Sequence, residues 1–250
     1  MRGLFLSRRP NPDAQLRLFC LPYAGAGASR YFRWASYFPP EIEICPVLLP
    51  GREGRINEQA FTDLNSLVEA LTEALVPEMD RPFALFGHSM GALISFELTR
   101  SLRRSPNLLP IHLFASGHRA PQIPAPAARL HGLPWPEFVD RMSMLEGAPE
   151  EIIAHPEYMD LILPTLRADF ELCESYVYKA DTPLQCPISA LGGLEDRKIS
   201  RDGLSAWAEQ TSSTFVLRTF PGGHLYLNDC EGQVVRSITM DLSHTLEPGI

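Results

Sequence analysis

The sequence predicts an α/β fold in which a mostly parallel sheet has helices on both faces and a helical lid insertion. Short apolar segments alternate with longer segments whose apolar residues recur at helical spacing. This alternation is typical of βαβ units, which bury a parallel sheet between two layers of helices. The chain has 250 residues, of which 45% are hydrophobic and 21% charged, so it can bury a large core without disulfides. We expect residues 1–250 to form a single domain.

Apolar segments bounded by proline, glycine or charged residues predict the strands of this sheet. In chain order they are Leu16–Pro22, Glu41–Gly51, Phe83–Gly87, Ile111–Gly117, Ile188–Gly193 and Thr214–Phe220. Amphipathic segments between the early strands predict helices over Ser29–Phe38, Thr62–Met79 and Met90–Arg104. Thr62 or Asp63 is suited to cap the second of these helices, and Asp202 is suited to cap a later helix over Gly203–Gln210.

The stretch between Gly117 and Ile188 contains no predicted strand and interrupts the sheet. It begins with a proline-rich segment and continues into a strongly helical one over Met159–Tyr176. An interruption of this length predicts a helical insertion over residues 121–180 that covers an active site as a lid. The alternative is that these helices pack against the body and gate nothing.

The composition argues against several classes of function. The formal net charge of −8 disfavours non-specific nucleic-acid binding, which needs a basic face. The five cysteines are odd in number and include no C-x-x-C motif, which is typical of free thiols in a reducing compartment. The apolar stretch near the N-terminus is too short for a signal peptide or a membrane span. We expect a cytoplasmic protein that binds neither nucleic acid nor membrane, with a monomer as the default state.

A G-x-S-x-G motif at Gly87–Gly91 contains Ser89. It follows a predicted strand and opens a predicted helix, which is the setting of a nucleophile elbow. The turn is sharp, so its neighbours must be small, and the glycines let strand and helix pack closely. The serine hydroxyl then lies at a helix N-terminus, where backbone N–H groups point toward it. Ser89 is therefore the candidate nucleophile.

A serine nucleophile needs a base and an acid that orients the base. Of the seven histidines, His224 lies in the glycine-rich segment PGGHLYL directly after the last predicted strand. Functional loops in α/β sheets lie at that edge, so His224 is the candidate base, whereas His88, beside the serine, is expected only to pack. The acid should lie between serine and histidine along the chain. Asp196 is preferred and Glu195 is the alternative, and spacing alone does not separate them.

The chain order serine, acid, histidine is that of the α/β-hydrolases. Their oxyanion hole would use the N–H of Met90, directly after the nucleophile, and a second N–H from the loop after an early strand. The segment PYAGAG supplies that loop, with Ala24 as the first choice and Tyr23 or Gly25 as its neighbours. A dinucleotide-binding interpretation of the same glycines is weak, because Arg30 replaces the final glycine of that motif. No metal-ligand spacing or P-loop occurs, so we expect no cofactor and no metal.

Six segments occur in an order that identifies a family resemblance: LPYAGAGASRYFRW, LLPGREGR, FGHSMGAL, LRADFELCESY, GGLEDRKIS and FPGGHLYL. Together they resemble the type II thioesterases, the stand-alone enzymes that accompany polyketide synthases and nonribosomal peptide synthetases. The resemblance extends from about Leu16 to about Asn228 and implies a triad of Ser89, Asp196 and His224, with the acid at Asp196. One departure is Leu225, where the family often has phenylalanine.

The resemblance implies hydrolysis of acyl groups from the phosphopantetheine arm of a carrier protein, without cofactor or metal. Alternatives are the related thioesterase that releases medium-chain fatty acids, a general carboxylesterase, and a non-catalytic binding protein on the same fold. Carrier proteins are usually acidic, as is this chain, so a local basic patch should surround the entrance. The candidates for this patch are Arg30, Arg33, Arg52 and Arg55, of which the last two are equally suited to structural ion pairs. In the lid, bulk at Met142 and Met144 is expected to set the acyl-chain preference.

Overall fold

The computed structural model describes residues 10–104, 108–124, 129–144 and 156–246. Its centre is a six-stranded parallel sheet in the order β2-β1-β3-β4-β5-β6. The strands are β1 (Leu16–Leu21), β2 (Ile42–Pro46), β3 (Phe83–His88), β4 (His112–Ser116), β5 (Ile188–Gly193) and β6 (Phe215–Phe220). All six predicted strands are confirmed. The second is shorter than the predicted Glu41–Gly51, because the chain beyond it turns at Gly51, which has a φ of 82°.

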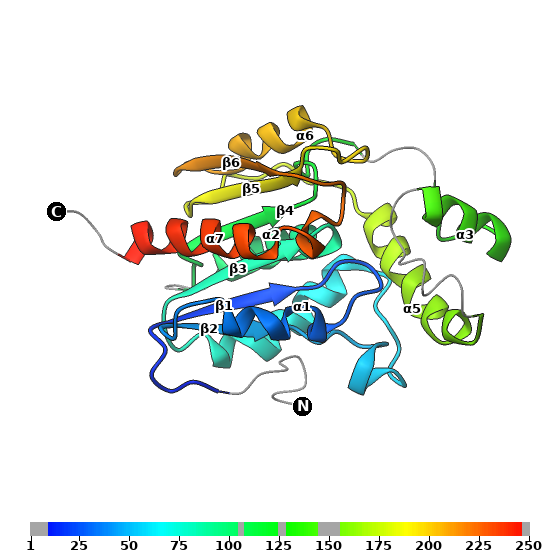
Figure 1. Ribbon diagram of the computed structural model, residues 1–250, viewed down its shortest axis with the longest axis horizontal. Coiled ribbons are helices and arrows are strands. Elements are labelled where there is room, and N and C mark those ends of the chain that lie inside the picture. The colour runs from blue at the N-terminus through cyan, green and yellow to red at the C-terminus, as the bar shows by residue number, and fades with distance from the viewer. Residues whose placement is uncertain (1–9, 105–107, 125–128, 145–155, 247–250) are drawn as a thin grey trace.

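Helices cover both faces of the sheet, as predicted (Figure 1). Side chains alternate along β1, so Leu16 and Leu18 contact one helix layer while Phe19 and Leu21 contact the other. The first layer contains η1 (Ala28–Ser36) and α7 (Glu231–Leu246). The second contains α1 (Leu64–Leu75), α2 (Met90–Leu102), α6 (Arg201–Ser205) and η4 (Ala206–Gln210). The short helices η2 (Glu53–Arg55), η3 (Val76–Glu78) and η5 (Tyr226–Asn228) lie in connections.

Helix termini follow the predicted chemistry in one case and not in another. Asp63 caps α1, since its carboxylate accepts a hydrogen bond from the Ser66 N–H at 2.8 Å. The prediction that Asp202 caps the later helix is wrong. Ser200 is the cap and accepts from the Gly203 N–H at 3.0 Å. Asp202 instead lies in the first turn, where a carboxylate interacts favourably with the helix dipole.

The stretch predicted as an insertion at 121–180 contains α3 (Trp135–Met144) and α5 (Pro156–Ser175). Both helices lie beyond the carboxyl ends of the strands, on the right in Figure 1. Side chains of α3 and α5 meet the body in a small apolar cluster that contacts Ala24. The side chains of Met142 and Met144 lie outside the described residues. None of the helices in the described ranges has the length and apolar character that a bilayer span requires.

Candidate active site

Ser89 lies on the turn between β3 and α2, at the carboxyl edge of the sheet. Its backbone has a φ of 52° and a ψ of −115°, a conformation that costs free energy in any residue with a side chain. The surrounding structure holds this strain, in part because the Ser89 N–H donates to the Ser116 carbonyl at 2.7 Å. The result is a partly exposed serine directly before the first residue of a helix.

The two glycines of the motif are required by close backbone approach. A Cβ added to Gly87 would lie 2.0 Å from the Gly91 carbonyl oxygen. A Cβ added to Gly91 would lie 2.3 Å from the carbonyl oxygen of Leu21 in β1. Both contacts are with backbone, which cannot move aside. The structure thus agrees with the steric reason that the sequence suggests for a serine between glycines.

His224 bridges Ser89 and Asp196. Its Nε2 lies 3.1 Å from Ser89 Oγ, and its Nδ1 lies 2.8 Å from Asp196 Oδ2. The other carboxylate oxygen of Asp196 accepts backbone hydrogen bonds from Lys198 at 2.8 Å and Ile199 at 3.2 Å. The side chains of Asp196 and His224 are only 1% and 7% exposed. The imidazole is therefore held with Nδ1–H toward the carboxylate and Nε2 toward the serine hydroxyl.

The environment of Asp196 keeps its carboxylate ionised. Burial acts to raise the pKa of this group, but hydrogen bonding and charge interaction with His224 act in the opposite direction. The amides of Lys198 and Ile199 add to that effect, so the pKa of Asp196 is lowered overall. Glu195, the alternative acid, has an exposed side chain. The structure therefore brings Asp196, and not the Glu195 carboxylate, to the histidine.

The loop after β1 lies close to the serine elbow, since the ring of Tyr23 packs 5.6 Å, between centroids, from the ring of His88. The Gly25 N–H donates to Asp169 Oδ2 at 2.8 Å, so this amide is already engaged. Met90 is the first residue of α2, and its N–H has no partner within the helix. Met90 and Ala24 therefore stay the predicted oxyanion donors, with Tyr23 as the alternative to Ala24.

Ser116 and Tyr226 support the site through hydrogen bonds that reach His88, and neither was singled out from the sequence. His88 is fully buried, and its Nδ1 lies 2.8 Å from Ser116 Oγ, which is in turn 2.5 Å from the Tyr226 hydroxyl. The His88 ring packs 5.3 Å from the His224 ring, between centroids, and burial lowers the pKa of His88 well below its usual value. His88 thus packs, as expected. Ser116 and Tyr226 carry no sequence signal, because they meet only through the fold.

Of the four arginines expected in a basic patch, Arg52 and Arg55 form the structural ion pairs that the sequence allowed as the equal alternative, and Arg30 is paired as well. Three of its four arginines are held in ion pairs: Arg30 with Glu231, Arg52 with Asp169, and Arg55 with Glu58. Arg52 and Arg55 are buried, and Arg30 is partly buried. Arg33 is exposed, next to the exposed Phe32.

The described residues contain no group of three or more His, Cys, Asp and Glu side chains that could hold a metal ion.

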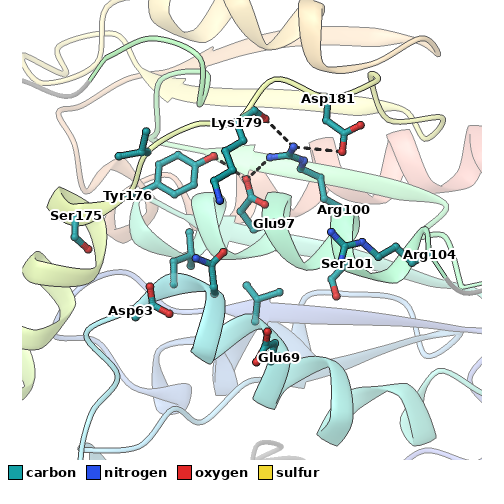
Figure 2. Close-up of a pocket in the computed structure, with 14 residues that line it drawn as sticks. Asp63, Glu69, Glu97, Arg100, Ser101, Arg104, Ser175, Tyr176, Lys179 and Asp181 are labelled. Carbon is teal, nitrogen blue, oxygen red and sulfur yellow. Dashed lines mark hydrogen bonds and ion pairs between the residues drawn. The ribbon is translucent and has the colours of Figure 1, made fainter.

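A cavity of about 310 Å³ lies between α1, α2 and the segment after α5, apart from the triad, and is lined largely by charged and polar side chains (Figure 2). Its wall carries Arg100, which donates to Glu97 at 2.7 Å and to Asp181 at 3.4 Å. Tyr176 also donates to Glu97, at 2.7 Å. These paired charges form a structural network, and neither Ser89 nor His224 lines this cavity.

A parallel sheet with a strained serine elbow after β3, an acid after β5 and a histidine after β6 defines an α/β-hydrolase. A family model for the thioesterase domain matches residues 16–242, and the chain therefore belongs to the thioesterase family. Thioester hydrolysis is the activity of this family.

Individual relatives agree with this assignment. The gramicidin S biosynthesis protein GrsT of Aneurinibacillus migulanus is 45% identical over 246 residues, which is 98% of this chain and 96% of that protein. The RedJ thioesterase from the prodiginine pathway of Streptomyces coelicolor is 34% identical, with a TM-score of 0.87 over 92% of this chain and 87% of that chain. The type II thioesterase BorB from the borrelidin cluster is 32% identical, with a TM-score of 0.88 over 99% of each chain. The resemblance to type II thioesterases is confirmed.

Proposed function

We propose that this protein removes acyl groups from the phosphopantetheine arm of carrier proteins in polyketide or nonribosomal peptide biosynthesis, with Ser89 as nucleophile. The observation that carries the proposal is His224, which contacts Ser89 Oγ at 3.1 Å and Asp196 Oδ2 at 2.8 Å. Support for the substrate class comes from relatives in gramicidin S, prodiginine and borrelidin biosynthesis. The free state of all five cysteines is typical of a reducing compartment, which supports a cytoplasmic location.

In the proposed acylation step, Ser89 Oγ attacks the thioester carbonyl carbon while His224 Nε2 takes the hydroxyl proton. Asp196 holds the imidazole in the required tautomer and stabilises the imidazolium that forms. The N–H groups of Met90 and Ala24 would stabilise the oxyanion. The C–S bond then breaks and the imidazolium returns the proton to the leaving thiolate. A leaving thiol with a pKa of about 8.5 departs readily, so little further assistance is needed.

In the proposed deacylation step, His224 takes a proton from a water molecule, which attacks the acyl-Ser89 ester. The second oxyanion uses the same two N–H groups, and its collapse returns Ser89 and releases the acid. Each step uses only side chains and amides of this chain.

A cavity of about 330 Å³ beside α2 would hold the distal part of the acyl chain; Ser89 and His224 do not line it, so the chain would have to extend into it from the triad. Its wall includes Leu93, one helical turn after Ser89 in α2, together with Ile123 and Cys173. Cys173 belongs to α5, so the insertion contributes part of this wall. This arrangement favours a lid role for the insertion over mere packing, because the acyl chain would lie between lid and body.

The test compares hydrolysis of acyl-carrier protein, acyl-CoA and a p-nitrophenyl ester by the purified protein and by Ser89→Ala. We expect the highest kcat/KM with the carrier-bound thioester and none with the variant. A preference for medium-chain acyl-carrier substrates would favour the fatty-acid alternative, and a preference for the oxygen ester would favour a carboxylesterase. Binding of the carrier without turnover would leave only the non-catalytic alternative.

A further inference from the structure

Two sequence motifs that the triad does not use meet in the structure. PGREGR lies in the loop after β2 and contains Arg52, whereas RADF lies in α5 and contains Asp169. The Arg52 guanidinium donates to both carboxylate oxygens of Asp169, at 3.0 and 2.7 Å. Their side chains are 7% and 3% exposed. Apolar residues often replace a buried ion pair without loss of stability, so this pair calls for a reason other than stability.

Both members of the pair also bind the loop that carries Ala24. Asp169 Oδ2 accepts the Gly25 N–H at 2.8 Å, and Arg52 Nη1 donates to the Ala26 carbonyl at 2.9 Å. The residues that directly follow Ala24 are therefore held on one side by α5 and on the other by the PGREGR loop. Gly25 has a φ of 77°, and the Ala26 N–H donates to the Tyr23 carbonyl at 3.0 Å, so these residues form a turn that Arg52 and Asp169 then fix to the PGREGR loop and α5.

Further contacts join the same three segments. The Thr165 hydroxyl, one turn before Asp169 in α5, donates to the Gly51 carbonyl. A Cβ added to Gly25 would lie 3.0 Å from Leu166 Cδ1. The Ala24 side chain packs against the apolar cluster that Leu166 forms with residues before and within α3. Thus α5 contacts this loop through a charged pair, a hydroxyl and an apolar surface.

We propose that Arg52 and Asp169 are positioning residues that align the Ala24 N–H only when the lid helix α5 is seated on the body. This inference rests on the oxyanion hole of the proposed function. Departure of α5 removes the acceptor of the Gly25 N–H and leaves Arg52 and Asp169 without each other. The oxyanion donor and the lid are thereby coupled, so a substrate that displaces α5 is bound but not hydrolysed.

The critical variant replaces both charges together, Arg52→Met with Asp169→Leu, because a single neutral substitution leaves an unpaired buried charge. The matched control is Arg17→Met with Glu43→Leu, a pair joined at 2.8 Å whose side chains are 7% and 2% exposed. That pair lies on β1 and β2, away from the loop after β1. Circular dichroism and thermal unfolding establish that both double variants are folded.

The readouts are kcat and KM for a short acyl N-acetylcysteamine thioester, and binding of two matched inhibitors. A trifluoromethyl ketone forms a tetrahedral adduct with Ser89 that needs the oxyanion donors, whereas the corresponding thioether lacks the carbonyl. Loss of one oxyanion donor typically lowers kcat about 10²- to 10³-fold. We expect a loss of that order in kcat and in ketone affinity for the Arg52/Asp169 variant, with KM and thioether affinity nearly unchanged. The Arg17/Glu43 variant should match the parent protein in all four.

Arg52→Lys provides a second variant that keeps the charge but loses the bidentate geometry. It should show a smaller loss in kcat and ketone affinity. The proposal is overturned if the folded Arg52/Asp169 variant or the folded Arg52→Lys variant keeps the parent kcat and ketone affinity. It is also overturned if these variants raise KM and leave kcat unchanged. Failure of the proposed function would look different: the parent protein itself would not bind the ketone, or Ser89→Ala would bind it equally well.

Discussion

The sheet of this protein carries two sets of a serine, a histidine and an aspartate joined by hydrogen bonds. In the first set the histidine is in the middle, since His224 contacts both Ser89 and Asp196. The serine is partly exposed and lies on a strained turn at the carboxyl edge of the sheet. A base thus touches the hydroxyl, and a carboxylate touches the base.

In the second set the serine is in the middle. Ser189 Oγ donates to Asp241 Oδ2 at 2.8 Å and lies 2.9 Å from His112 Nε2. A hydroxyl has one proton, which goes to the carboxylate, so Ser189 must accept a hydrogen bond from His112 Nε2–H. The imidazole is therefore a donor toward the serine and cannot act as its base. Ser189 is also fully buried within β5.

The difference between the two sets lies in the order of hydrogen bonds and in access, not in residue type. The first set matches the requirements of nucleophilic catalysis, in which the base must accept the proton of an accessible hydroxyl. The second set satisfies buried polar groups that connect β4, β5 and α7. Four predictions test this comparison, from the largest expected effect to the smallest.

The largest contrast should come from the two serines. Ser89→Ala should lower kcat for an acyl thioester by about three to six orders of magnitude while the protein stays folded. Ser189→Ala should leave kcat within about twofold but should cost about 1–3 kcal/mol of stability, because His112 Nε2–H loses its buried acceptor. Steady-state kinetics and urea denaturation of both variants measure these effects. Near-normal turnover by Ser89→Ala would refute the mechanism.

Substitutions of the two aspartates should differ as those of the two serines do, with the loss of kcat in the first set and the loss of stability in the second. Asp196→Asn should lower kcat by up to about 10⁴-fold, because the amide no longer holds His224 in the tautomer that accepts a proton. Asp241→Asn should keep kcat and lower the urea midpoint, because it weakens the bonds to Ser189 and Arg218. A loss of kcat in the Asp241 variant at unchanged stability would show that the second set contributes to the reaction.

The sequence predicts the first set because its signals are local. Ser89 lies in a motif with a defined strand–turn–helix setting, and His224 and Asp196 each follow a strand. The strands themselves are predicted because their apolar runs are short and bounded by turn residues. The sequence signal is weakest for the acid, because burial and hydrogen bonding, and not spacing, distinguish Asp196 from Glu195.

Long-range side-chain pairing could not be predicted. Arg52 and Asp169 are 117 positions apart, and His112 and Ser189 are 77 apart. Nothing local indicates that such residues meet. The same limit explains why Arg30 was expected at an open surface and is instead paired with Glu231, 201 positions away. Exposure of a charged side chain depends on which segments the fold brings to it.

The third prediction concerns pH and the second set. Burial lowers the pKa of His112 to about 4, with Asp241 opposing this shift and Arg218 adding to it. Its unfolded pKa is about 6.5, so the unfolded state binds more protons between these values and stability falls as pH decreases through that range. A shift of this size corresponds to about 3 kcal/mol.

His112→Phe removes this titration and keeps an aromatic ring against Phe114, whose ring centroid lies 4.3 Å from that of His112 in a stacked arrangement. The parent protein should lose more free energy of unfolding between pH 7.5 and pH 4 than the variant does. Urea denaturation across that range measures the difference, and the other histidines are common to both proteins. Parallel pH profiles would mean that His112 titrates alike in the folded and unfolded states.

The smallest effect should come from a change at Glu195, the exposed residue directly before Asp196 of the first set. The Glu195 N–H donates to the Gly222 carbonyl at 3.0 Å, so its backbone helps to hold the loop before His224 while its side chain is exposed. Glu195→Gln keeps that backbone bond and changes only an exposed charge. Substitutions of this kind alter free energies by at most about 0.5 kcal/mol, which is about twofold in rate. Steady-state kinetics should therefore give a kcat within about twofold of the parent value. A loss comparable to that of Asp196→Asn would instead require the Glu195 carboxylate to turn inward during the reaction and orient His224 itself.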